Sequence, residues 1–178
     1  MSYLPLLVSA TMAPALALTY WAILFGGVAR YRLAEDDGVG YLGSGYWGGI
    51  VDPATIRAIV AFQGLMVLGL TYWLYWITIT PAPPGSVLAR PWFLATSFAA
   101  FWLGSIAWPL ATWHARASGG SHWPPVLCLW LAAAGVLALA AGTFEADAGA
   151  LPILAILAVA NVVVLADGVG WSAAFLSR

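Results

Sequence analysis

Four polar side chains in otherwise apolar stretches are the residues of this chain best placed to do chemistry. Arg57 and Gln63 lie in one such stretch, and Asn161 and Asp167 lie in another with the same spacing of six residues. Polar groups are costly inside hydrocarbon, so they tend to face other protein groups or a water-filled pathway. We therefore take these four residues as the candidate ligand-binding site or translocation pathway.

The two stretches are expected to cross the membrane in opposite directions. The four residues then form two pairs, and the members of each pair lie at the same depth in the membrane. Arg57 and Asp167 would lie near one face of the membrane, with Gln63 and Asn161 about 9 Å deeper. We predict an ion pair between Arg57 and Asp167, and we expect both amides to face protein. Six residues turn a helix through about 240° net, so the two pairs cannot both lie along one straight seam.

Two interpretations of these four residues stay open from the sequence. In the first they only hold the helices together, because the ion pair is self-neutralising and the amides link neighbouring helices. In the second they line a crevice on the inner side of the membrane that admits a small solute, an ion or an amphipathic ligand.

Other kinds of chemistry have little support in the sequence. His114 and His122 bracket a short loop with no neighbouring carboxylate or cysteine, so no metal site is predicted. The single cysteine, Cys128, cannot form an internal disulfide and is expected to be a buried free thiol. The chain contains no lysine, so it cannot hold a Schiff-base cofactor, and no other cofactor is indicated. Titratable groups are scattered, and we therefore name no catalytic residue.

The composition indicates that these residues belong to a membrane protein. Of the 178 residues, 63% are hydrophobic and 7% are charged, whereas soluble domains carry about 25% charged residues. The mean hydropathy is +0.92. A net charge of -1 and six scattered arginines leave no basic surface for nucleic acid. We predict an all-α integral membrane protein whose main partner is the lipid bilayer.

Five apolar stretches are long enough to cross about 30 Å of hydrocarbon. The second has the clearest start, because Asp52 can cap the helix and Pro53 suits its first turn. The first begins close to Met1 with no basic segment before it, so we expect a retained span rather than a cleaved signal peptide. We predict one domain over residues 1–178, a bundle of five transmembrane helices at about 4–28, 53–80, 91–113, 124–142 and 150–168 or longer.

The arginines predict the orientation of this bundle. With five spans, Arg90 alone falls on one side of the membrane and the other five arginines fall on the opposite side. Because short basic loops favour the cytoplasmic side, we predict an outside N-terminus and an inside C-terminus. The glycine-rich and aromatic-rich segment 30–51 is too polar to cross, so we expect an inner loop that packs on the membrane surface.

Helix contacts can also be predicted from small and aromatic residues. Thr96, Ala100 and Gly104 recur at intervals of four in the third span, a pattern that lets another helix approach closely. Most of the eleven tryptophans fall near predicted span ends, so we interpret them as interfacial anchors. Trp102 and Trp130 fall in mid-span and either pack against helices or contact a ligand.

These features favour two classes of function over a third. The first is a small polytopic membrane protein that binds or transports a small solute or amphipathic ligand through an inner-side crevice between the second and fifth helices. The second is a non-catalytic membrane-embedded subunit of a larger membrane complex. A small homo-oligomer would be compatible with the first class. An integral-membrane enzyme is the least favoured class. A cavity that reaches Gln63 or Asn161 would favour the first class, and broad uncovered helix faces would favour the second.

Overall fold

The computed structural model describes residues 4–21 and 53–176, which are helical apart from short connections and contain no strand. The long helices are α1 (Leu4–Trp21), α3 (Pro53–Ile79), α4 (Pro91–Ser118) and α5 (Trp123–Glu145). A 3-10 turn, η3 (Val87–Ala89), precedes α4. The last helical segment runs without a break through α6 (Ala150–Ala160), the π-helical η4 (Asn161–Trp171) and α7 (Ser172–Leu176).

Four helical segments in the described part of the chain are long and apolar enough to cross a membrane. They are Ala61–Ile79, Pro91–Ala115, Trp123–Glu145 and Ala150–Trp171. The all-α membrane class is therefore confirmed, and these helices indicate a multi-pass membrane protein. The apolar part of α1, Leu7–Thr19, is shorter. The end of the first predicted span and the predicted loop at 30–51 lie outside the described residues.

Proline and glycine explain where several helices begin and end. Both α4 and α5 carry proline in the first turn, where its missing N–H costs nothing. The α4 helix continues beyond the predicted end at 113 and stops at Gly119, whose φ of 61° is left-handed and favours glycine. His114 therefore lies on α4 rather than in the predicted loop.

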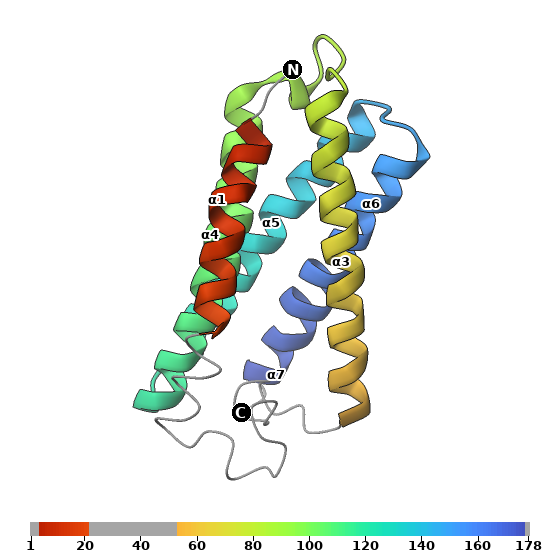
Figure 1. Cartoon of the computed structure of the whole chain (residues 1–178). Helices are drawn as coiled ribbons and strands as arrows, with labels where there is room; N and C mark the ends of the chain where they lie inside the picture. Colours follow the sequence, from red (N-terminus) through yellow and green to blue (C-terminus); the bar gives the residue numbers. More distant parts are fainter. Residues whose placement is uncertain (1–3, 22–52, 177–178) are drawn as a thin grey trace.

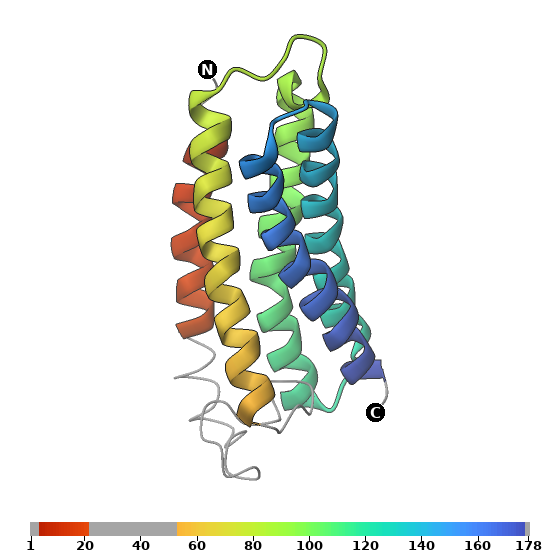
Figure 2. The same cartoon turned by 90° about the vertical axis from the view of Figure 1, so that its right-hand side faces the viewer.

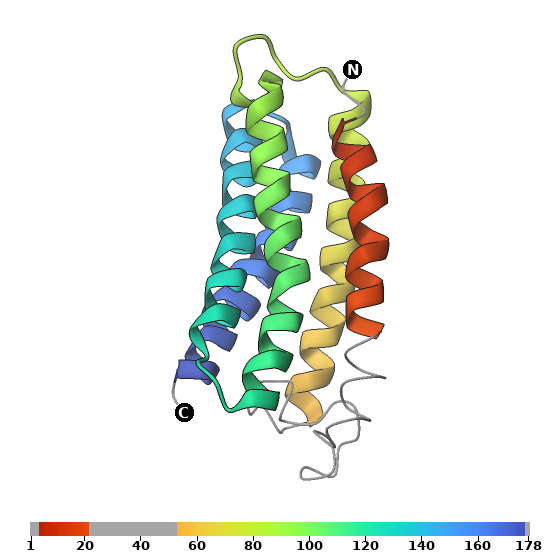
Figure 3. The same cartoon turned by 90° about the vertical axis from the view of Figure 1, so that its left-hand side faces the viewer.

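The helices form an elongated bundle of two closely packed pairs with α1 on one side (Figure 1). The α4 helix packs mainly on α5, and α3 packs mainly on α6 (Figure 2). The η4 segment contacts α5 and so joins the two pairs. The α1 helix contacts both α4 and α3, and Figure 3 shows it beside α3 at the edge of the bundle.

The α4–α5 pair depends on two glycines that face each other's helix backbone. A Cβ added to Gly104 would lie 2.5 Å from the carbonyl oxygen of Cys128. A Cβ added to Gly135 would lie 2.5 Å from the carbonyl oxygen of Ser97. Within a membrane, close packing of this kind replaces the hydrophobic effect as the main attraction between helices.

The small-residue stripe predicted on α4 is correct only at Gly104. Thr96 is exposed, and its hydroxyl donates to the carbonyl oxygen of Trp92 on its own helix at 2.8 Å. The contact row runs instead through Ser97, Phe101 and Gly104. Alternating steps of four and three keep residues on one face of a 3.6-residue helix, whereas repeated steps of four drift around it.

A glycine and a hydrogen bond also position α3. A Cβ added to Gly69 would lie 2.6 Å from the carbonyl oxygen of Ala155 in α6, so the two backbones approach closely. On another face of α3, the buried Trp73 Nε1 donates to Thr143 Oγ1 of α5 at 2.9 Å. These two contacts fix α3 between α6 and α5.

We expect Thr143→Val to lower the free energy of unfolding by about 1 kcal/mol, because it leaves the buried Trp73 N–H without its acceptor. A double-mutant cycle with Trp73→Phe, measured by circular dichroism during unfolding in SDS, gives the coupling energy. Thr71→Val is the control, because the Thr71 hydroxyl donates only to the Val67 carbonyl oxygen of its own helix. A coupling energy of zero would show that this bond contributes nothing to stability.

The interpretation of the tryptophans as anchors is wrong for four that are buried in the core: Trp73, Trp76, Trp108 and Trp171. Their rings fill space between helices, as in the edge-to-face contact of Trp108 with Trp171 at a centroid distance of 4.4 Å. Trp92 and Trp123 are exposed, as an interfacial position requires.

Candidate functional site

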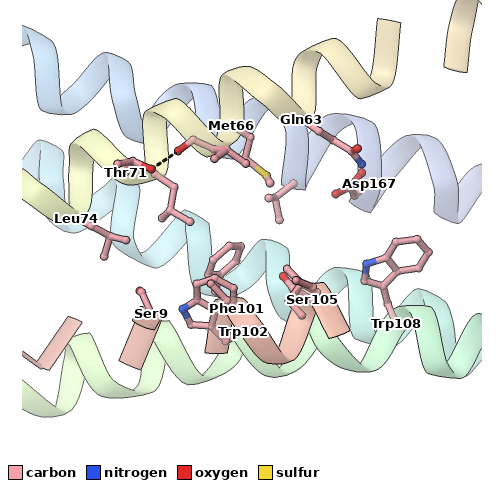
Figure 4. Close-up of a pocket in the computed structure, with 16 residues that line it drawn as sticks. Ser9, Gln63, Met66, Thr71, Leu74, Phe101, Trp102, Ser105, Trp108 and Asp167 are labelled. Atoms are coloured by element: carbon pink, nitrogen blue, oxygen red, sulfur yellow. Dashed lines mark hydrogen bonds between the residues drawn. The ribbon is translucent and has the colours of Figure 1, made fainter. Parts of the chain in front are cut away.

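A partly open cavity of about 430 Å³ lies where α1, α3, α4 and η4 come together (Figure 4). It exists because α3 packs on α6 and α4 packs on α5, which leaves space between the two pairs on the side that α1 covers. Its walls are mostly apolar side chains from three helices: Leu16, Met66, Leu70, Leu74, Phe101 and Trp102.

One end of the cavity is polar. Gln63 from α3 and Asp167 from η4 both line this end, near Trp108 of α4 (Figure 4). Asp167 Oδ1 is enclosed and accepts no hydrogen bond from the described residues. The Gln63 side chain also makes no hydrogen bond within the described chain. Enclosed polar groups normally have partners, so this end can still bind a hydrogen-bonding group.

The far end of the cavity offers little hydrogen bonding. Thr71 lines it, but its hydroxyl donates to the Val67 carbonyl oxygen, the dashed contact in Figure 4, at 2.8 Å. Ser9 of α1 is buried, and its Oγ has no hydrogen-bond partner among the described residues. The cavity is therefore amphipathic, with an acidic and amide end and a long apolar remainder that carries the hydroxyls of Ser9 and Ser105.

Helical spacing explains how these side chains reach one cavity. Gln63, Met66, Leu70 and Leu74 follow one another at steps of three or four and so share one face of α3. The same face could have been read from the sequence by stepping along the helix from Gln63. Trp102, which the sequence left open between packing and ligand contact, is buried at the cavity wall.

Asp167 comes from the π-helical segment η4, in which each N–H bonds five residues back rather than four. Such segments are rare and frequently occur at functional sites. Gly168 lies in this segment, and a Cβ there would approach the Val163 carbonyl oxygen to 3.3 Å. Asp167 therefore reaches the cavity from a π-helical segment in which the backbone around Gly168 is closely packed.

The structure brings two of the four predicted site residues together, places Asn161 elsewhere and does not describe the side chain of Arg57. Gln63 and Asp167 share the cavity. Arg57 lies on α3, but its side chain is outside the described part, so its ion pair with Asp167 stays a prediction. Asn161 is exposed in a separate groove beside Phe62, so the expectation that it faces protein does not hold within the described chain.

Among the described residues, no group of three or more histidine, cysteine, aspartate or glutamate side chains could hold a metal ion. The cavity residues that the sequence analysis missed come from α1, α4 and η4 and from the rest of the same face of α3. Alanines and a serine in an apolar helix carry no signal of their own, which explains why α1 was overlooked.

The fold and the cavity define a multi-pass helical membrane protein with an amphipathic space between its helices. Comparisons with protein-family models, with curated proteins and with solved structures found no match.

Proposed function

We propose that the protein binds a small amphipathic molecule in the cavity between α1, α3, α4 and η4. The head group of this molecule donates hydrogen bonds to Asp167 and Gln63, and its apolar part lies along Met66, Leu70 and Trp102. The enclosed Asp167 Oδ1, which no described residue hydrogen-bonds, carries this proposal. An unsatisfied enclosed acceptor costs about 1–3 kcal/mol, which a ligand N–H or O–H would recover.

The size and lining of the cavity support a small ligand. Ligand sites commonly measure about 300–1,000 Å³ and combine apolar walls with a few polar groups, and this cavity of about 430 Å³ falls within that range. Aromatic side chains at Phe101, Trp102 and Trp108 add flat surfaces against which rings or chains can pack.

The finer topology belongs to the same proposal. We infer five spans, with α1 as part of the first, a glycine-rich and aromatic-rich inner loop at 30–51, an outside N-terminus and an inside C-terminus. The five-to-one division of arginines supports this orientation. The α1 helix begins and the α7 helix ends at opposite ends of the bundle, which supports termini on opposite sides of the membrane (Figure 1). The Gln63 and Asp167 end then lies toward the inner side, where the ligand would enter or leave.

A suitable probe is 1-aminoanthracene, which combines an apolar ring system with one amine that donates hydrogen bonds. We expect the purified chain in detergent to bind one probe molecule, detected as a single mass adduct by native mass spectrometry. Asp167→Leu and Gln63→Leu should each weaken binding, the former by about tenfold, because it leaves the amine N–H of the probe without its enclosed acceptor, a loss of about 1–3 kcal/mol.

Asp147→Asn is the control, because it removes an exposed carboxylate from the turn between α5 and α6 and asparagine tolerates the left-handed φ of 47° at this position. It should bind the probe as the unaltered chain does. Equal binding by the unaltered chain, Asp167→Leu and Gln63→Leu would mean that the probe enters the detergent or another site, and the proposed function would be rejected.

A further inference from the structure

Asn161 is an exposed polar residue in the middle of a membrane-crossing helix. It lies near the centre of the candidate span Ala150–Trp171 and is exposed. Its amide makes no hydrogen bond within the described chain. Lipid tails offer no hydrogen-bond partner, so an amide left in the hydrocarbon is costly. Its position therefore calls for a partner outside the described chain.

The surface around Asn161 is shaped to receive another helix. Asn161 lines an outward groove of about 270 Å³ between α3 and α6, on the side of α3 away from the cavity. Large apolar side chains flank it, with Phe62 51% and Leu154 61% exposed. Ala158 lines the groove, and its methyl group lies against Gly69 of α3, so the close α3–α6 contact forms the floor of the groove.

We propose that this groove is the docking surface for a second copy of the chain, in which the two Asn161 amides hydrogen-bond to each other across a two-fold axis. An asparagine amide has both donors and an acceptor, so two identical amides satisfy each other, as a two-fold interface requires. Two copies inserted in the same direction also place Asn161 at the same depth. A lone carboxylate or ammonium at this position could not pair with its own copy in this way.

The dimer face is separate from the ligand cavity, although both use α3. Phe62 contributes to the groove and its neighbour Gln63 contributes to the cavity, on different faces of the helix. The inference does not depend on the proposed ligand, and a failure of either proposal leaves the other unaffected.

The test measures self-association of the full chain. Copies that carry donor or acceptor fluorophores at the C-terminus are mixed in detergent, and energy transfer is followed as detergent is added. We expect Asn161→Leu to weaken dimerisation about tenfold, the effect of a polar contact of the strength found between membrane helices. Leu154→Trp should also weaken it, because the larger ring fills the groove while Asn161 stays in place.

Leu137→Trp is the matched control, since Leu137 is an exposed leucine on α5, outside the groove. It should dimerise like the unaltered chain. Circular dichroism confirms that each variant is folded. The proposal is overturned if the unaltered chain is monomeric at every detergent ratio, or if Asn161→Leu and Leu154→Trp both dimerise normally. The full chain can also be extracted from its membrane together with whatever protein is bound to it. If the bound protein is a different membrane protein, and Asn161→Leu releases it, the proposal is also overturned.

Discussion

Gly104→Leu is expected to prevent stable folding, because any Cβ at this position would meet the Cys128 carbonyl oxygen at 2.5 Å and the Ala132 nitrogen at 2.5 Å. Both atoms belong to the α5 backbone, so neither can turn aside as a flexible side chain would. The two helices must separate, which also breaks the reciprocal contact at Gly135. We expect a loss of about 3 kcal/mol or more in the free energy of unfolding, at the upper end of overpacking effects.

The measurement is SDS unfolding followed by circular dichroism, with size-exclusion chromatography as a check for aggregation. Gly64→Leu is the matched control, because a Cβ added there has nothing within 4 Å. Both substitutions raise helix propensity by a similar amount, so they differ mainly in packing. If Gly104→Leu is as stable as Gly64→Leu, the close α4–α5 contact does not hold the bundle together.

Ala13→Phe is expected to abolish binding of 1-aminoanthracene without unfolding the protein. Ala13 lines the cavity from α1, so a phenyl ring there can occupy part of the cavity. We expect probe binding to fall by more than about tenfold, since the ring displaces the apolar part of the ligand. Stability should stay equal or rise, because filling a cavity adds apolar contacts.

Ala10→Phe is the control for this substitution. Ala10 lies on the same helix and is exposed, but it does not line the cavity. Retained binding in Ala10→Phe and lost binding in Ala13→Phe would place the ligand behind α1. Normal binding in both variants would place the probe elsewhere.

Much of the helical framework could be predicted from the sequence, because it depends on local signals. The starts of α3 and α4 coincide with Pro53 and Pro91, where proline suits a first turn. The tryptophans were harder to place, because an indole ring serves equally well as an interfacial anchor and as core filling. Position along a span does not distinguish these roles, and the buried Trp108 and Trp171 show the consequence.

The candidate site could be predicted in part for a similar reason. Gln63 and Asp167 are polar residues within apolar stretches, and the cost of such residues in lipid identifies them. Sequence spacing gives the depth of a side chain along a helix but not the direction in which it points. Asn161 was therefore predicted to lie beside Gln63, whereas it lies in an exposed groove on the surface of the bundle. The α1 wall of the cavity depends on helix packing alone, which no local pattern encodes.

The most direct test of ligand binding in the cavity is to identify what stays bound when the full chain is extracted from its membrane into lipid nanodiscs. Native mass spectrometry would compare the unaltered chain with Ala13→Phe and Ala10→Phe. We expect the unaltered chain and Ala10→Phe to retain one discrete small molecule with a hydrogen-bond-donating head group and an apolar body, and Ala13→Phe to lack it. Retention of the same molecules by all three chains, or of none by the unaltered chain, would contradict a ligand site between α1, α3, α4 and η4.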